Sequence, residues 1–279
     1  MFYPVLIDSL NTKPTKMEQK NNSFKKLLTG LFALVFIAGI QVQSIAQITA
    51  YEYRHVPDDK IAEFIKRETT YWDKVKDKGI KDKKMTFWAL LEKVGGYDQP
   101  NSSNFLFINT FPNIDLAEDM WTNAESVAGA KMEQMETNSM STTTSSFFMH
   151  DEGWAQDAKT DPGKDFNYVV MVYHNTNYAD SLINLEKKYW SPFIQKAMDN
   201  DQTPQVGWGN ARLLAPMGDN IKFTTVSYDL YKTLQEALMP KWDPKTMLPT
   251  KGLDMINKLE LNRRGISIYR IVKVGSAPN

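Results

Sequence analysis

A repeated sequence pattern constrains the fold of this chain more than any other feature. The pattern Glu-x-x-Tyr-Trp occurs twice, at Glu68–Trp72 and again at Glu186–Trp190. A strand-like run that ends in histidine precedes each copy and a tryptophan follows it: His55 and Trp88 in the first copy, His174 and Trp208 in the second. The offset between matched residues of the two copies varies only from 118 to 120. This small variation indicates a duplication with small insertions or deletions.

Each copy is predicted to contain a strand, a helix, two strands, a helix and a closing strand. The helices follow from apolar residues at i, i+3, i+4 and i+7, and the loops from Gly, Pro, Asn and Asp clusters. In the first copy the strands cover 48–55, 85–94, 105–111 and 145–154, and the helices run from 57 to Gly79 and over 116–135. In the second copy the strands cover 168–174, 207–214, 221–228 and 266–274, and the helices cover 180–198, 233–238 and 250–263.

This element order predicts an α+β fold made of two tandem ferredoxin-like (βαββαβ) repeats. Such a unit has one antiparallel sheet with both helices on one face. The other sheet face is left uncovered, and a second copy in the same chain can cover it. The sequence therefore predicts two domains, a first repeat over 47–160 and a second over 161–279, joined by a polar linker at 156–164.

Two such sheets in one chain resemble the dimeric α/β-barrel superfamily, here in a tandem-repeat form that makes an intramolecular pseudo-dimer. That superfamily includes antibiotic-biosynthesis-type monooxygenases, NIPSNAP-like proteins, muconolactone isomerases and haem-using enzymes. The resemblance rests on element order and on the duplication, and it covers nearly all of 47–279. It implies the fold, whereas a reaction has to be argued from a site.

The first 46 residues read as a targeting segment. Lys25 and Lys26 precede an apolar run over 27–40, and the small residues of Ser44–Ala46 come before Gln47. This is the pattern of a secretory signal peptide cleaved after residue 46, with Met17 as the expected start. The apolar run is shorter than the ~20 residues that a transmembrane helix needs. We therefore expect a periplasmic or secreted protein with no membrane anchor after cleavage.

Composition excludes several classes of function. The chain has no cysteine, which excludes disulfides, thiolate metal sites and cysteine nucleophiles. Its formal net charge is zero, so it lacks the basic surface typical of nucleic-acid binding. It also lacks the nucleotide-binding, nucleophile-elbow and zinc motifs. We expect no cofactor and no metal from the residues themselves, while the haem-using members of the superfamily keep haem open.

Five polar residues are candidates for catalysis. Glu68 and Glu186 fall on the inward faces of the first helix of each copy, where a carboxylate is costly unless paired. Each could act as a general base, or could be a structural partner for a Tyr or Trp. His55 and His174 end matching strands, where they could do acid–base work or simply hydrogen-bond a loop. His150 has no counterpart in the second copy, so it is the candidate if only one copy keeps a site.

A repeated aromatic set is the candidate ligand-binding surface. Large aromatics could line an apolar pocket, although they more often pack in cores. The set consists of Tyr71, Trp72, Trp88, Tyr189, Trp190 and Trp208.

These features favour an exported protein that binds a small molecule, with no role for nucleic acid. The alternative is a cofactor-independent or haem-assisted oxygenase or isomerase that acts on a small apolar substrate. A pocket lined by His and Glu would favour the enzyme, and solid packing around Glu68 and Glu186 would favour the binding module. The ligand and the oligomeric state stay open.

Overall fold

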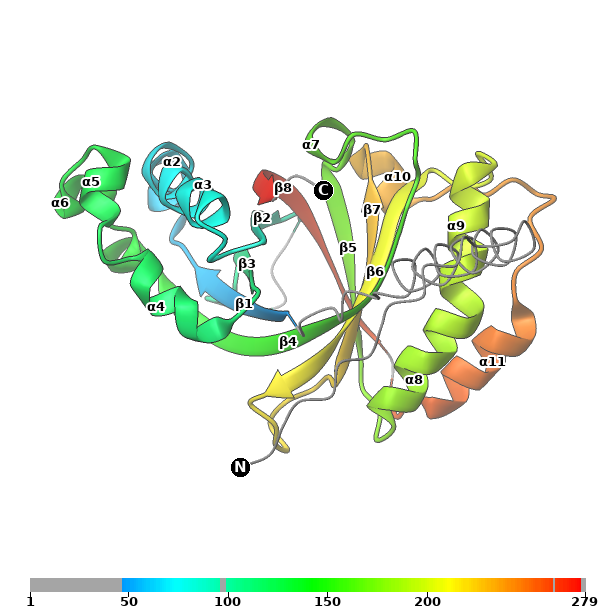
Figure 1. Ribbon diagram of the computed structural model, residues 1–279. Helices are drawn as coiled ribbons and strands as arrows, with labels where there is room; N and C mark the ends of the chain where they lie inside the picture. The colour runs from blue at the N-terminus through cyan, green and yellow to red at the C-terminus, as the bar shows by residue number, and fades with distance from the viewer. Residues whose placement is uncertain (1–46, 96–98, 263, 277–279) are drawn as a thin grey trace, which may run out of the picture. The chain divides into compact units, whose positions relative to one another are not determined.

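The computed structural model describes residues 47–95, 99–262 and 264–276 (Figure 1). The expected signal peptide, residues 1–46, lies outside the described residues. Residues Ala46–Asn279 form one compact unit. The division of this unit into repeats at residue 160 therefore stays a prediction.

The first half of the chain contains four strands and a series of helical segments. The strands are β1 (Ile48–His55), β2 (Phe87–Lys93), β3 (Phe105–Phe111) and β4 (Thr142–Gln156). The helices between β1 and β2 are η1 (Asp58–Lys60), α2 (Ile61–Arg67), the π-helix η2 (Glu68–Trp72) and α3 (Asp73–Lys81). Those between β3 and β4 are η3 (Ile114–Leu116), α4 (Ala117–Met120), α5 (Ala124–Ala128), α6 (Met132–Met135) and η4 (Asn138–Met140).

The second half has the same alternation of strands and helices. After the short α7 (Pro162–Asp165), its strands are β5 (Tyr168–His174), β6 (Gln205–Ala215), β7 (Thr225–Tyr231) and β8 (Gly265–Ser276). Its helices are α8 (Ala179–Leu185), the π-helix η5 (Glu186–Trp190), α9 (Ser191–Asp199), α10 (Leu234–Leu238) and α11 (Thr250–Leu259).

The eight described strands form one closed antiparallel barrel. Their order around the barrel is β1-β3-β2-β8-β5-β7-β6-β4. Each half thus supplies four neighbouring strands, and two seams, β2–β8 and β4–β6, join the halves. The structure is therefore a mixed α/β protein built around a closed barrel.

Side chains from both halves fill the interior of the barrel. Alternate residues of each strand point inward, as the pleat requires. Tyr51 and Tyr53 of β1 meet Met171 and Tyr173 of β5 in this core. The hydroxyls of Tyr53 and Tyr173 lie 3.0 Å apart, so the two halves share a hydrogen bond inside the barrel.

The helices pack outside the barrel (Figure 1), mainly over the strands of their own half, while α9 also packs on β4 and α3 on β8. In the first half Phe64 packs on Leu90, Phe105 and Phe107 of the sheet. In the second half Ile194 packs beside Trp208 of β6. Each outer layer has its own apolar core, and the core of the second half also includes Ala155 of β4.

Several predicted boundaries differ from the structure for physical reasons. Gly79 does not end its helix: it lies inside α3, and a Cβ there would come 2.3 Å from the sulfur of Met120, so the close approach requires glycine. The predicted helix over 116–135 is a chain of short helical turns. The strand predicted from 221 begins only at Thr225, because Ile221 and Phe223 pack into the core from a loop.

Among the described residues, no helix combines the length and the apolar character needed to cross a membrane.

Candidate functional site

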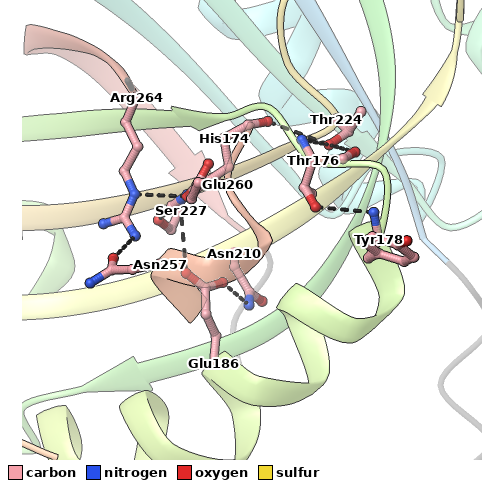
Figure 2. Close-up of polar contacts among 10 residues, drawn as sticks. All are labelled: His174, Thr176, Tyr178, Glu186, Asn210, Thr224, Ser227, Asn257, Glu260 and Arg264. Carbon is pink, nitrogen blue, oxygen red and sulfur yellow. Dashed lines mark hydrogen bonds and ion pairs between the residues drawn. The ribbon is translucent and has the colours of Figure 1, made fainter. Parts of the chain in front are cut away.

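A buried histidine lies at the centre of a polar cluster between the second half of the barrel and its helices (Figure 2). His174 Nδ1 lies 2.6 Å from Glu260 Oε1, and His174 Nε2 lies 2.7 Å from Ser227 Oγ. Glu186 Oε1 is 3.8 Å from the same Nε2. Arg264 Nε donates to Glu260 Oε1 over 2.7 Å. We call these five residues the His174 cluster; the imidazole at its centre is only 2% exposed.

Four separate segments bring these side chains together. His174 is the last residue of β5 and points outward because Tyr173 points into the barrel. Ser227 lies on the same outer face of β7, and Glu260 directly follows α11. Glu186 is the first residue of the π-helix η5. A π-helical turn inserts an extra residue into the helix and is frequent at functional sites.

The pKa values of the two carboxylates in the cluster are shifted in opposite directions. Burial raises the pKa of Glu186, and this is only partly offset by His174 and by Asn210, whose Nδ2 donates to Glu186 Oε2 over 2.8 Å. Burial also favours the neutral form of Glu260, but the hydrogen bond and charge of His174, with Arg264, outweigh it and lower the pKa of Glu260. Glu260 is therefore the anionic partner that orients the imidazole.

The orientation of the imidazole assigns its tautomer. A carboxylate can only accept, so Nδ1 carries a proton and donates it to Glu260. When the ring is neutral, Nε2 is then the acceptor and receives the hydroxyl hydrogen of Ser227. This assignment rests on the hydrogen-bond partners. The arrangement leaves a base at Nε2 with a hydroxyl directly on it.

A further, partly buried acid, Asp229, lies two residues along β7 from Ser227, on the same face of the strand. Gln205 Nε2 donates to its Oδ1 over 2.6 Å. Burial raises the pKa of Asp229 to about 7, with a smaller contribution from the charge of Glu186. Asp229 thus ionises near neutral pH beside the cluster.

Three buried oxygens around the cluster have no hydrogen-bond partner among the described residues. They are Asn210 Oδ1, Thr225 Oγ1 and Glu260 Oε2. Thr225 pairs directly with His174 between β7 and β5. Because buried polar atoms are normally hydrogen-bonded, three unpartnered oxygens in one place indicate a site that can hold a further polar group.

Two cavities of about 530 Å³ each are lined by residues of the second half, and no residue of the His174 cluster lines either of them. The first, the strand-end cavity, is bounded by the segment after β5 and the segment between β6 and β7. Thr176 and Thr224 line it, and the Thr224 N–H donates to the backbone carbonyl of His174 over 2.8 Å. The second, the helix groove, lies between α8 and α11. Leu185 and Leu259 line this groove and directly precede Glu186 and Glu260 in the chain.

The first half of the barrel has no equivalent cluster at the matching place. In the second half Asn210 pairs with Ser227, and the corresponding pair in the first half is Leu90 with Phe107. Leu90 and Phe107 are buried in the apolar core under α2 and α3. The polar surface that surrounds His174 is thus a property of the second half.

Glu68 is buried, as the helical pattern predicts, but it has a different partner from the one expected. Its Oε1 accepts from Thr137 Oγ1 over 2.7 Å, and its Oε2 lies 3.3 Å from the ammonium of Lys76. Lys76 is itself 4% exposed and lies over the ring of Trp88. Glu68 therefore neutralises a buried lysine, and a catalytic role for it stays a prediction.

The other two predicted histidines lie outside the cluster. His55 Nδ1 contacts the carbonyl oxygen of Ser102 at 2.8 Å, and no contact joins it to Glu68 within the described residues. The match of His55 with His174 is wrong by one residue, because sheet pairing gives Arg54 the place of His174.

His150 lies in a half-exposed ionic network. His150 Nδ1 is 3.0 Å from Glu152 Oε1, and Glu152 also binds Lys187. The network connects β4 to η5 at the surface. Catalysis by His55 or His150 stays a prediction.

The six predicted aromatic residues do not line the strand-end cavity or the helix groove. Trp88 and Trp208 are buried in the two outer cores. Trp72 donates to the carbonyl of Met135 over 2.7 Å, and Trp190 packs on Phe193. Tyr71 and Tyr189 are partly buried against neighbouring helices. Their role in ligand binding stays a prediction, and packing is what the structure shows for them.

The described residues offer no histidine to hold a haem. An axial histidine needs a free ring nitrogen that faces a cavity. Both ring nitrogens of His174 have protein partners, and neither His55 nor His150 lines the cavities described above. The described part of the chain also has no group of three acidic or histidine side chains placed to hold a metal ion.

Sequence reasoning found His174 and Glu186 but missed the rest of the site. Ser227 and Asn210 lie on strands at positions where the first half has Phe and Leu, so a comparison of the two copies could have found them. Glu260 and Arg264 follow a helix that has no clear counterpart in the first half. Nothing in the local sequence connects them to a histidine 86 residues away.

Comparison with known proteins supports the fold. The sequence matches no family model and no curated protein. The solved structures that match with a TM-score above 0.5 include the following three. One is a provisionally assigned monooxygenase from Lactobacillus acidophilus NCFM, with TM-score 0.56 and 10% identity over 83% of this chain and 97% of that one. Another, from Fusobacterium nucleatum and assigned in the same provisional way, has TM-score 0.54 and 9% identity over 84% and 95%.

The third is an anthrone oxidase-like protein, with TM-score 0.52 and 14% identity over 86% of this chain and 97% of that one. At these identities the likeness concerns the fold alone. With the closed ring of strands and the helices outside it, this shows that the protein has the dimeric α/β-barrel fold, with both halves of the barrel supplied by a single chain.

Proposed function

We propose that this protein is a cofactor-independent oxygenase in which His174 removes a proton from a small, largely apolar substrate. The observation that carries the proposal is the short contact of 2.6 Å between His174 Nδ1 and the Glu260 carboxylate. A carboxylate on one ring nitrogen orients the ring and raises the basicity of the other nitrogen. The names of the fold relatives, two provisional monooxygenases and one anthrone oxidase-like protein, support the same class of reaction.

Ser227 would carry the proton between the substrate and His174. Its hydroxyl donates to Nε2, so it can accept a substrate proton as it passes its own proton to the imidazole. The imidazolium that forms lies between Glu260 and Glu186, and both stabilise its charge. Loss of the proton leaves a carbanion or enolate, which can react with dioxygen. For a CH₂ group the sum is CH₂ plus O₂ giving C=O plus H₂O, and it needs no external reductant.

The proposal also covers the repeat structure of the barrel and the export of the chain. We propose that the barrel consists of two tandem ferredoxin-like repeats, 47–160 and 161–279, which form an intramolecular pseudo-dimer. The π-helices at Glu68 and Glu186 and the hydroxyl pair of Tyr53 and Tyr173 support it. We also propose that residues 1–46 direct the chain to the periplasm or out of the cell.

The test is dioxygen uptake with anthrone and related aromatic ketones that have an acidic CH₂ group. His174→Gln should lower kcat by about 10²- to 10⁴-fold, the usual contribution of a general base. The matched control is His150→Gln, which removes a histidine outside the cluster and should keep full activity. Because His174 is buried, the Tm of each variant is measured in parallel. Full activity in folded His174→Gln would contradict the proposal.

A second candidate function is ester hydrolysis with Ser227 as nucleophile. The contacts of Ser227 Oγ to His174 Nε2 and of His174 Nδ1 to Glu260 follow the order of a Ser–His–acid triad. A fluorophosphonate probe distinguishes the two functions, because it labels Ser227 only if that hydroxyl attacks an electrophile. Ser227→Ala should abolish hydrolysis, whereas in the oxygenase it should slow proton transfer without abolishing it.

A further inference from the structure

The helix groove between α8 and α11 combines an apolar floor with positive charge. Leu185, Met255 and Leu259 supply the apolar surface, and Met255 is 38% exposed. Lys188 and Lys258 supply the charge, and no acidic residue lines the groove. In the described part of the chain neither lysine has an acidic partner within ion-pair distance; Lys188 lies near only the ring of Tyr189, at 5.2 Å.

Two residues of the groove adjoin the His174 cluster in sequence. Its two leucines directly precede the acids of the cluster: Leu185 comes before Glu186, and Leu259 before Glu260. One oxygen of Glu260 is buried and unpartnered beneath α11. A molecule in the groove would therefore contact residues that adjoin the two carboxylates in sequence, although no residue of the cluster lines the groove.

The wall formed by α11 depends on a close contact with η5. Gly252 packs against Tyr189 so tightly that a Cβ would come within 2.4 Å of the Tyr189 Cβ. After the helix, Glu260 and Arg264 attach the chain to the cluster. This attachment fixes the width of the groove near its inner end.

We propose that the helix groove binds an apolar organic anion, with the anionic group between Lys188 and Lys258 and the apolar body over the leucines. Charge complementarity supports this occupant: a groove with two unpaired cations and no acid favours one negative charge. Its volume of about 530 Å³ suits a small aromatic or aliphatic acid. Binding of the anion stands by itself, whereas its identification as the substrate of the His174 cluster rests on the proposed function.

The absence of cysteine allows a local test. Asn184 lines the groove and is exposed, so Asn184→Cys places a single thiol there. The rate of its reaction with 5,5′-dithiobis(2-nitrobenzoate), an aromatic dicarboxylate, is divided by the rate with the neutral 4,4′-dithiodipyridine. The same ratio is measured for Gln235→Cys, at an exposed position of α10. We expect this ratio of rates to be about three- to tenfold higher for Asn184→Cys than for Gln235→Cys. A preference of this size corresponds to the attraction between the anionic reagent and two exposed lysines.

The lysines are then removed in the Asn184→Cys background. Lys188→Met with Lys258→Met should reduce the ratio to that of Gln235→Cys. The control is Lys196→Met with Lys251→Met, which removes two exposed charges elsewhere and should leave the ratio high. Equal ratios at the two cysteines, or no response to loss of Lys188 and Lys258, would overturn the proposal.

The readout is independent of turnover, so it separates this inference from the proposed function. His174→Gln should leave the labelling ratio unchanged, because the imidazole is buried and does not line the groove. A high ratio in a protein with no oxygenase activity would refute the proposed function and keep the binding site. Oxygenase activity with no charge preference in the groove would refute the binding site alone.

Discussion

Asp229 makes the stability of this protein sensitive to pH near neutrality. Its carboxylate is partly buried on the outer face of β7 and accepts a hydrogen bond from the side-chain amide of Gln205. Burial raises its pKa from 3.8 to about 7. Between these two values the folded protein keeps this proton while the unfolded chain has lost it. The free energy of unfolding therefore falls as the pH rises through this window and levels off above pH 7.

The size of the effect follows from the shift. Each pKa unit corresponds to 1.36 kcal/mol, so a shift of about three units costs about 4 kcal/mol once the folded carboxyl is ionised. Asp229→Asn removes the ionisation and keeps an oxygen that can accept from Gln205. The variant should be more stable than the wild type at pH 8, and its advantage should grow by about 2 to 3 kcal/mol between pH 5 and pH 8.

Urea unfolding of both proteins at pH 5, 6, 7 and 8 measures this difference. Asp254→Asn is the matched control, because Asp254 is an exposed carboxylate on α11. Its stability difference from the wild type should stay nearly constant across the series. If the difference for Asp229→Asn were also constant with pH, or if the variant were less stable at pH 8, the assignment of a buried, proton-retaining carboxyl would be wrong.

Two further predictions concern packing outside the cluster. Lys76→Met should lower the unfolding free energy by about 3 to 5 kcal/mol, because it leaves the buried Glu68 carboxylate without its ion-pair partner. In a double-mutant cycle, the added change Glu68→Gln should restore most of that loss. Gly252→Ala should cost about 1 to 3 kcal/mol, since its Cβ would overlap Tyr189, whereas Gly163→Ala, at an exposed position with only a contact at 3.4 Å, should stay close to wild type in urea unfolding.

The sequence predicted three of the strands with the limits that the structure shows. The limits of β1, β3 and β5 agree with the predicted 48–55, 105–111 and 168–174, because these runs are apolar and rich in β-branched and aromatic residues. The π-helices could not be predicted, since a pattern search at 3.6 residues per turn does not register one inserted residue. Both begin at the glutamate of the repeated pattern, Glu68 and Glu186, so the duplicated sequence encodes that irregular turn.

The candidate site was predictable only in part because it depends on long-range contacts. Periodicity placed Glu186 on an inward face, and the strand end placed His174 near it. The third partner, Glu260, reaches the histidine only because α11 packs across η5. In the first half the same kind of glutamate meets Lys76, so the repeated pattern alone could not distinguish a structural pair from a reactive one.

The closed barrel also determines when the fold can be completed. Its seam between β2 and β8 pairs Phe87 with Ser276, near opposite ends of the described chain. Until β8 arrives, β2 and β5 each have an unpaired edge, and open edges of this kind recruit strands from other molecules. A product truncated before Gly265 would keep both edges exposed and should aggregate. Pairing of β8 with β2 and β5 is therefore the step that closes the barrel. For a chain that we propose to be exported, this late closure would keep the protein open until its full length has been delivered.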